Sequence, residues 1–265
     1  GEGIAVLVSD APTGPFTDPI GKRLIDSDHI WQDIDPTVAI DDNGQAYLYW
    51  GNPKLWFVKL NKDMISYDKN IGDKGIVSID MTTEAFGSKA GRDGKPGPTY
   101  TEGPWFYKRN SLYYMVYAAE GIPEYISYST SNSPEGPWTY KGHIMKRADH
   151  LAFTNHSGII DFKGNSYIFY HDQSLSKGQG FKRSVSVEQF AYNADGSIPV
   201  IPATKEGVIK SVANLDPYKR VEAETIAWSE GLKTSGNSQN GVYVTKISNG
   251  DYIKVRSVDL GKGAK

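Results

Sequence analysis

Cysteine is absent from the sequence, which excludes disulfide bonds and thiolate metal sites. No apolar run approaches the roughly 20 residues that a membrane-spanning helix needs. The formal net charge of −2 and a pI of about 6.2 give no electrostatic reason to expect nucleic acid or an anionic membrane as a partner. Gly-x-Ser-x-Gly and Gly-x-Gly-x-x-Gly are also missing, so neither a serine-hydrolase elbow nor a phosphate-binding loop is supported.

Aromatic residues and glycine are plentiful instead. The sequence has 17 Tyr, 9 Phe, 6 Trp and 28 Gly, a composition typical of aromatic-rich strands joined by tight turns. No segment keeps a helical period, because proline or glycine interrupts nearly every candidate. We therefore predict an all-β fold. Aromatic surfaces of this kind often stack against sugar rings, although they also fill protein cores.

One pattern occurs three times along the chain. A polar residue is followed by a short apolar strand, a turn with Gly or Asn, and an aromatic strand, starting at Asp35, Glu102 and His156. Each copy has the pattern of a β-hairpin. The copies start 67 and 54 residues apart, which suits four-stranded propeller blades with loops of variable length. A β-sandwich is the competing all-β fold.

The polar residues that open these copies are candidate site residues. In a propeller the first strand of each blade lines the central channel, so Asp35, Glu102 and His156 are expected to meet near one end of the axis. Pro36 should hold Asp35 in an extended conformation. Taken singly, each residue has a simpler explanation, as a carboxylate at a turn or a histidine in a core. Their equivalent positions favour a shared site.

Three further residues are candidates for contact with a ligand. Arg183 follows a glycine-rich loop that can aim its guanidinium into the pocket, although a solvated arginine at a strand end fits equally well. Trp105 and Phe153 can line a sugar site, although packing between blades is the simpler role for either. His156 has no second histidine at metal-ligand spacing, so we expect no zinc. A lone imidazole completed by waters suits a weakly held ion.

The strand pattern lapses after about residue 200, and a new pattern begins at Val221. We predict a first domain over residues 1–213, a linker over 214–220 and a second domain over 221–265. About 50 residues are too few for an independent β-sandwich. The sequence also opens without Met in a strand-like run over residues 4–8, so we expect both domains to be truncated.

The three copies resemble motifs of glycoside hydrolase family 43, in Ile34-Asp35-Pro36, Thr101-Glu102-Gly103-Pro104-Trp105 and Asn155-His156-Ser157-Gly158. The resemblance implies a five-bladed β-propeller, with its first blade largely missing here, that cleaves α-L-arabinofuranosides and β-D-xylosides with inversion. The segment from Val221 to Ile253 resembles the start of a family 6 carbohydrate-binding module, which is a β-sandwich. The combination is most similar to family members that act on arabinoxylan.

The resemblance also implies roles for individual residues. Glu102 corresponds to the general acid, and Asp35 to the carboxylate that raises the acid's pKa and orients it. His156 corresponds to the ligand of a central ion, usually calcium, and Arg183 to an arginine in the −1 sugar subsite. In the module, the structural calcium site is implied near two acidic residues, Glu222 and Glu224.

The general base of the family is an Asp in the first blade, and we expect it upstream of Gly1. The fragment alone is therefore expected to be inactive, although the whole enzyme would remove α-L-arabinofuranosyl side chains from arabinoxylan. Three alternatives stay open: a β-xylosidase, an arabinanase, or a catalytically silent carbohydrate-binding propeller. The polymeric substrate implies a secreted, extracellular protein whose signal peptide lies outside this sequence. We expect a monomer.

Overall fold

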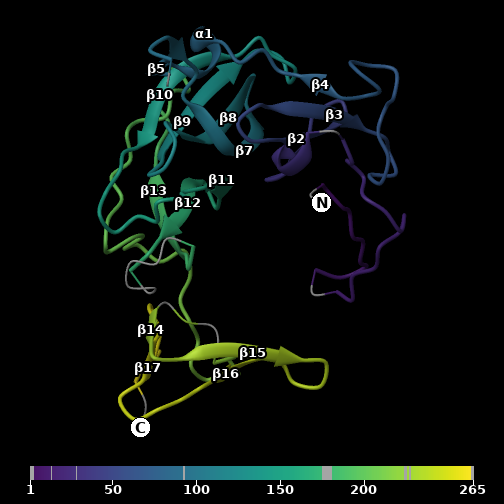
Figure 1. The fold of residues 1–265 in the computed structure, drawn as a ribbon. Helices are drawn as coiled ribbons and strands as arrows, with labels where there is room; N and C mark the ends of the chain where they lie inside the picture. Colours follow the sequence, from purple (N-terminus) through teal and green to yellow (C-terminus); the bar gives the residue numbers. More distant parts are fainter. Residues whose placement is uncertain are drawn as a thin grey trace. The chain divides into compact units, whose positions relative to one another are not determined.

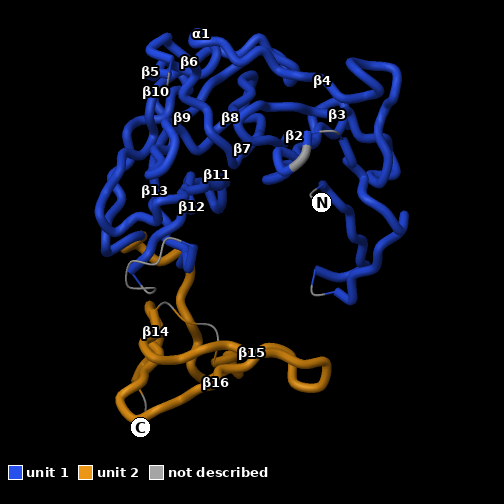
Figure 2. Tube along the Cα trace, viewed as in Figure 1, with its two compact units in different colours: residues 1–207 blue, residues 208–265 orange. Residues whose placement is uncertain are grey.

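The computed structural model describes residues 3–12, 14–27, 29–91, 93–174, 181–223, 226 and 228–263. The regular elements among the described residues are strands, apart from one α-helix, α1 (Thr83–Phe86), and one 3-10 turn, η1 (Ile30–Gln32). No helix among them is long and apolar enough to cross a membrane. The chain divides into two compact units, residues 1–207 and 208–265 (Figure 2).

The first unit contains two four-stranded antiparallel sheets and one three-stranded sheet (Figure 1). The first sheet consists, in spatial order, of β1 (Thr37–Ile40), β2 (Ala46–Trp50), β3 (Trp56–Leu60) and β4 (Val77–Ser78). The order in space equals the order in sequence, so each strand pairs with the next one along the chain. This is the meander that a propeller blade requires.

The second sheet repeats this arrangement. It consists of β7 (Tyr100–Arg109), β8 (Leu112–Ala119), β9 (Tyr125–Ser131) and β10 (Thr139–Met145), again paired in sequence order. The short strands β5 (Lys89–Ala90) and β6 (Pro96–Gly97) pair with each other in the connection before it.

The third sheet has three described strands, β11 (Ser157–Phe162), β12 (Asn165–Asp172) and β13 (Ser184–Phe190). Each of the three sequence copies therefore builds the first hairpin of one sheet, as the hairpin pattern predicted. The all-β prediction is confirmed. The described strands do not close into a ring, so the count of five blades stays a prediction.

Aromatic side chains fill the layers between the sheets. One buried cluster joins the first sheet to the second, and in it the rings of Tyr49 and Phe106 lie 4.8 Å apart between centroids. A second cluster joins the second sheet to the third and includes Val116, Tyr128 and Ile168. Aromatic pairs of this kind contribute about 0.5–1.5 kcal/mol each beyond the area they bury. Much of the aromatic content thus serves the core.

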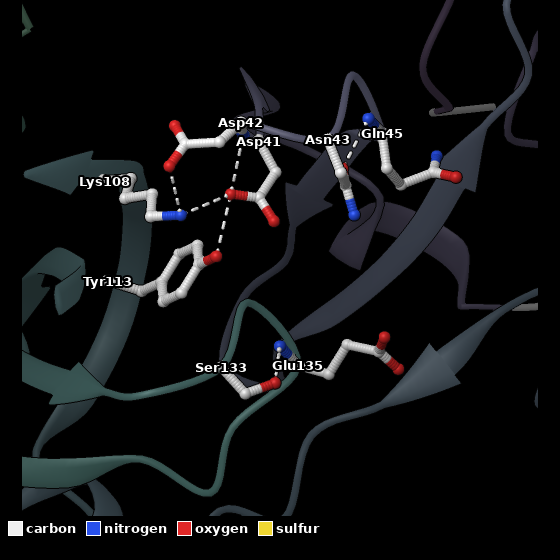
Figure 3. A network of polar contacts seen from close by, with 8 residues as sticks. All are labelled: Asp41, Asp42, Asn43, Gln45, Lys108, Tyr113, Ser133 and Glu135. Atoms are coloured by element: carbon white, nitrogen blue, oxygen red, sulfur yellow. Dashed lines mark hydrogen bonds and ion pairs between the residues drawn. The ribbon is translucent and has the colours of Figure 1, made fainter. Parts of the chain in front are cut away.

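A polar network ties the turn between β1 and β2 to the second sheet (Figure 3). Lys108 Nζ lies 2.9 Å from Asp41 Oδ1 and 2.8 Å from Asp42 Oδ2. The hydroxyl of Tyr113 donates to the same Asp41 oxygen at 2.7 Å. Asp41 and Asp42 are thus hairpin-turn residues that fasten neighbouring sheets, and exposed ion pairs of this type add up to about 1 kcal/mol each.

The strand expected over residues 4–8 is not formed. Only two isolated bridges occur there, Ile4 with Ile25 and Val8 with Thr17. The side chain of Ile4 is buried against the outer face of the first sheet, while Leu7 and Val8 are exposed. A strand needs a continuous partner for its backbone groups, and the described residues offer this segment only those two contacts.

The second unit holds two strand pairs. β14 (Trp228–Glu230) pairs with β17 (Tyr252–Lys254), and β15 (Lys233–Asn237) pairs with β16 (Gly241–Thr245). Its large apolar side chains are mostly exposed, including Trp228, Val242 and Ile253. The described part of this unit therefore has two pairs of antiparallel strands but no buried apolar cluster of its own.

Candidate active site

Asp35 is placed by the segment that precedes it. The buried carboxylate of Asp33 accepts a hydrogen bond of 2.7 Å from Trp50 Nε1, at the end of β2. One residue further on, the backbone N–H of Gly51 donates to the carbonyl of Ile34 at 3.1 Å. These bonds fasten the start of the first copy to the end of its second strand, and Asp35 follows directly.

The backbone of Asp35 differs from the expectation. We predicted an extended conformation because Pro36 follows, but φ is +57°, in the left-handed region. Asp is one of the few residues besides glycine that adopts this region, at a cost of about 1–2 kcal/mol. The prediction was wrong because the anchors at Asp33 and Ile34, directly before Asp35, outweigh the local preference. Strain of this kind is frequent at functional sites.

Glu102 lies in β7, where the pairing with β8 is irregular on both sides of it. Gly103 follows with φ of +59°, and a Cβ added there would lie 2.7–2.9 Å from atoms of the His156 ring. Glycine is therefore required for two reasons, the backbone conformation and the close approach of the imidazole. The imidazole belongs to the loop before β11, so this contact joins the second copy to the third.

The structure brings Asp35, Glu102 and His156 together. Their ligand atoms all lie within 4.8 Å of one another. His156 Nε2 lies 3.5 Å from Glu102 Oε1, and both side chains are largely buried. Three residues far apart in the sequence thus form one cluster at the starts of three first strands, where the repeat placed them.

Two residues that the sequence did not single out also contact Glu102. Asn52 Nδ2 donates a hydrogen bond of 2.6 Å to Glu102 Oε2. Glu124, only 1% exposed, lies close enough to Glu102 for the two carboxyls to shift each other's pKa, and its Oε2 accepts the backbone N–H of Asn155 at 2.6 Å. Both lie in loops next to proline, Asn52-Pro53 and Pro123-Glu124, where the sequence pattern indicated only turns.

The two glutamates are strongly coupled. The contact with His156 lowers the pKa of Glu102 to about 2, against the effect of burial. Burial and the contact with Glu102 raise the pKa of Glu124 to about 8. Two facing carboxyls cannot both be ionised cheaply, so the pair as a unit keeps one proton at neutral pH.

The other two members of the cluster respond to these charges. Burial raises the pKa of Asp35, and the charge of Glu102 raises it further, against the opposing effect of His156. For His156, burial disfavours the charged form, but the contacts with Glu102 and Asp35 outweigh it and raise the pKa. Without a bound ion, the imidazole is therefore disposed to carry positive charge between carboxylates.

Buried polar atoms without a partner concentrate in this region. Among the described residues there are six, and four of them belong to the cluster and its supports: Asp35 Oδ2, Glu124 Oε1, Asn155 Nδ2 and His156 Nε2. Buried polar groups in folded proteins are nearly always hydrogen-bonded, so such a concentration indicates a place that binds waters, an ion or a ligand.

Arg183 and Phe153 lie close to the cluster. Arg183 Nη1 donates to Thr154 Oγ1 at 3.3 Å, and its charge acts on Asp35. Burial, together with the charges of Arg183 and His156, lowers the pKa of His171 to about 4. Phe153 packs edge-on against Phe181, which is 74% exposed, with ring centroids 4.9 Å apart. The guanidinium thus lies within electrostatic reach of Asp35, and the backbone carbonyl of Phe153 accepts the N–H of Glu124 at 3.0 Å.

Trp105 lies further along β7. Its Nε1 donates to the carbonyl of Ile159 in β11 at 3.1 Å, and its ring lies over Gly158. The indole thus joins two first strands, while 38% of it remains exposed. Its contact with a substrate stays a prediction.

The cluster also offers ligand atoms that are close enough together to hold a cation. It is the one group of three acidic or histidine ligands found among the described residues, and His156 Nε2 is buried without a partner. Calcium takes six to eight oxygen ligands, so waters would have to complete the shell. In the second unit, Glu222 is exposed and pairs with Arg220 at 2.8 Å, and Glu224 lies outside the described residues.

Known proteins resemble this chain in both sequence and fold. The model of glycosyl hydrolases family 43 matches residues 1–198. The arabinoxylan arabinofuranohydrolase of Bacillus subtilis (strain 168) is 36% identical over 306 aligned residues, which cover 99% of this chain and 55% of that protein. The chain therefore spans about half the length of this relative.

Two solved structures agree with this similarity. A family 43 arabinoxylan arabinofuranohydrolase from Bacillus subtilis, in complex with cellotetraose, matches with a TM-score of 0.76 at 33% identity, over 95% of this chain and 55% of that one. A family 43 β-xylosidase/α-arabinofuranosidase from a compost microbial metagenome, in a calcium-free form with xylotriose, matches with a TM-score of 0.57 at 28% identity, over 75% and 65%.

Proposed function

Because this chain belongs to glycoside hydrolase family 43, we propose that it is part of an enzyme that removes α-L-arabinofuranosyl side chains from arabinoxylan, with Glu102 as the general acid. The observation that carries the proposal is the convergence of Asp35, Glu102 and His156 within 4.8 Å. The similarity to arabinoxylan arabinofuranohydrolases over nearly the whole chain supports this substrate above others.

The chemistry we propose is inverting hydrolysis. Glu102 protonates the leaving oxygen, while a second carboxylate about 6.5–9.5 Å away activates water on the other face of the sugar ring. Asp35, as an anion beside Glu102, favours the protonated acid by like-charge repulsion. We assign the base to no residue of this chain.

The two glutamates share one proton, which lies on Glu124 in the absence of substrate and would have to move to Glu102 for Glu102 to act as the acid. An acid with a pKa of about 2 would be ionised at neutral pH, but Glu124 holds a proton up to about pH 8 in contact with it. A proton is therefore present on the pair throughout the neutral range. Its position on Glu102 is what the leaving oxygen requires.

Substrate contacts in the proposal come from the residues that flank the cluster. Arg183 offers planar N–H donors for sugar hydroxyls, and Phe153 with its exposed partner Phe181 offers a face for a ring. Trp105 extends this surface along β7. These contacts would orient the glycosidic oxygen toward Glu102.

We further propose that His156 ligates a calcium ion, which when bound would supply positive charge at the cluster. The unpartnered Nε2 of His156 supports this. In the absence of substrate, EDTA should lower Tm and added calcium should restore the original Tm. The reason is that an ion bound only by the folded state stabilises that state. His156→Gln should reduce the response, and a wild-type Tm indifferent to both reagents would rule the ion out.

The remaining proposals concern the second unit, the localisation of the protein and its oligomeric state. Residues 221–265 would begin a carbohydrate-binding module, with Glu222 and Glu224 near its calcium site. The protein would be secreted, because its substrate is an extracellular polymer. We also propose that it acts as a monomer. Binding of arabinoxylan by the isolated full module would test the first of these points.

The substrate assignment is tested on a panel. The full-length protein is assayed on arabinoxylan, linear arabinan and an aryl β-D-xyloside, and we expect arabinose release from arabinoxylan to be fastest. Preference for the xyloside would favour a β-xylosidase, an activity that appears in the name of the related metagenomic enzyme. Binding without any turnover would favour a silent carbohydrate-binding propeller.

A further inference from the structure

The loop after β2 is attached to the start of β7 by two hydrogen bonds. Asn52 Nδ2 donates to Glu102 Oε2 at 2.6 Å, and the buried hydroxyl of Tyr100 donates to the carbonyl of Gly51 at 2.8 Å. The loop belongs to the first sheet, and Glu102 to the second. The side chain of Asn52 therefore reaches the carboxyl of Glu102 from a neighbouring sheet.

The two oxygens of Glu102 consequently have different surroundings. Oε2 accepts from the Asn52 amide, whose N–H cannot accept a hydrogen bond in return. Oε1 lies 3.5 Å from His156 Nε2, beyond ordinary hydrogen-bond length. The carbonyl oxygen of a carboxylic acid accepts hydrogen bonds better than its hydroxyl oxygen does, so the bond from Asn52 to Oε2 favours protonation of Glu102 on Oε1.

We propose that Asn52 is a positioning residue for Glu102, which fixes the rotamer of the carboxyl and reserves Oε1 for the proton that is transferred. The inference rests on the proposed function. Effective proton transfer needs the donor within hydrogen-bond reach of the leaving oxygen, and a misplacement of about 1 Å can cost about 100-fold in rate. A carboxyl free to rotate would present the protonated oxygen in the wrong direction for part of the time.

A purely structural role for Asn52 makes a different prediction. If its hydrogen bond only holds two sheets together, its loss should lower stability and reduce activity on every substrate by the same factor. A positioning role affects only those substrates whose leaving group needs a proton. The dependence of rate on the leaving group therefore separates the two.

The test uses a series of aryl α-L-arabinofuranosides, from 2,4-dinitrophenyl to phenyl, and arabinoxylan, with kcat and KM measured for the full-length protein. Asn52→Ala removes the donor. Asn52→Asp keeps the shape but offers only acceptors, and it serves if the alanine variant folds poorly. Glu102→Ala reports the effect of losing the acid. Asn165→Ala removes an exposed amide that accepts from Gln189 at 2.8 Å, and serves as the matched control.

We expect Asn52→Ala and Asn52→Asp to lower kcat on arabinoxylan and the phenyl glycoside by about 10- to 100-fold, a part of the 10²–10⁴-fold worth of a general acid. The dinitrophenyl glycoside should change less than about threefold, KM should stay near wild type, and Asn165→Ala should match wild type throughout. An equal loss across the series, or no loss, overturns the positioning role. If Glu102→Ala itself shows no dependence on the leaving group, the proposed function fails instead.

Discussion

The carboxyl of Glu102 receives contacts from three separate segments, through Asn52, Glu124 and His156. The hydrogen bond from Asn52 and the contact with His156 favour its charged form, whereas the buried Glu124 keeps a proton next to it. At the scale of residues, several groups of the site therefore compete for one proton. Removing one partner should change how the remaining groups titrate.

Replacement of Glu124 by Gln should change the pH dependence of stability. The folded pKa of Glu124 is about 8, above its ordinary value of 4.5. Its stabilising contribution is therefore complete below about pH 4.5 and is lost as pH rises to about 8, by up to about 1.4 kcal/mol per pH unit. Glu124→Gln cannot titrate, so its free energy of unfolding should fall less steeply between pH 5 and 8 in urea titrations. Glu84→Gln, at an exposed position of α1, controls for the lost charge, and equal slopes in all three proteins would contradict the interaction of Glu124 with Glu102.

The sequence predicted three members of this cluster and missed two. Asp35, Glu102 and His156 occupy equivalent places in a repeat, so their convergence follows from the repeat alone. Asn52 and Glu124 reach the cluster from turns, and a turn's path depends on the packing of neighbouring sheets. The left-handed backbone of Asp35 was missed for the same reason, because anchors at Asp33 and Gly51 decide it.

At the scale of elements, the irregular start of β7 controls the site. The shifts in register around Glu102 turn its side chain toward the cluster, and Gly103 lets the His156 ring lie against the backbone. The hairpins themselves were predictable, since alternating aromatic residues and Gly or Asn turns determine them locally. The irregular register was not, because it depends on what the neighbouring strands leave room for.

Replacement of Gly103 by Ala should damage both stability and activity. The new Cβ would lie 2.7–2.9 Å from the His156 ring, and the backbone φ of +59° is unfavourable for alanine. We expect a loss of about 1–3 kcal/mol in the free energy of unfolding, with displacement of the imidazole.

The matched control for this variant is Gly164→Ala. Gly164 also has a positive φ, +76°, but a Cβ there meets nothing within 4 Å. It should therefore show only the backbone cost of about 1 kcal/mol and near-normal activity. Urea denaturation and arabinose release measure the two effects. Equal stability and activity in the two variants would mean that the contact with His156 has no consequence.

At the scale of the whole molecule, the two units differ in how they are stabilised. All three buried apolar clusters consist of residues before 207, whereas the described strands of residues 208–265 leave their apolar side chains mostly exposed. The composition predicted an all-β chain in two parts, and the repeat predicted blade-like sheets. The number of blades stays a prediction, because closure of a propeller depends on contacts between its first and last sheets.

A chain that ends at residue 207 should therefore fold by itself. The three apolar clusters remain complete in it, so we expect a cooperative thermal transition within about 5 °C of the longer chain, given that about 1 kcal/mol shifts Tm by about 2–4 °C at this size. Differential scanning calorimetry measures it. Loss of the cooperative transition would show that residues 208–265 contribute to the fold of the first unit.

The most direct test of the central claim is the turnover of Glu102→Gln on arabinoxylan. Glutamine keeps the size of the side chain and its hydrogen-bonding capacity but has no proton to donate to the leaving oxygen. With circular dichroism and Tm showing a folded variant, we expect kcat for arabinose release by the full-length protein to fall by at least about 100-fold. Near-normal turnover by the folded variant would contradict the assignment of Glu102 as the general acid.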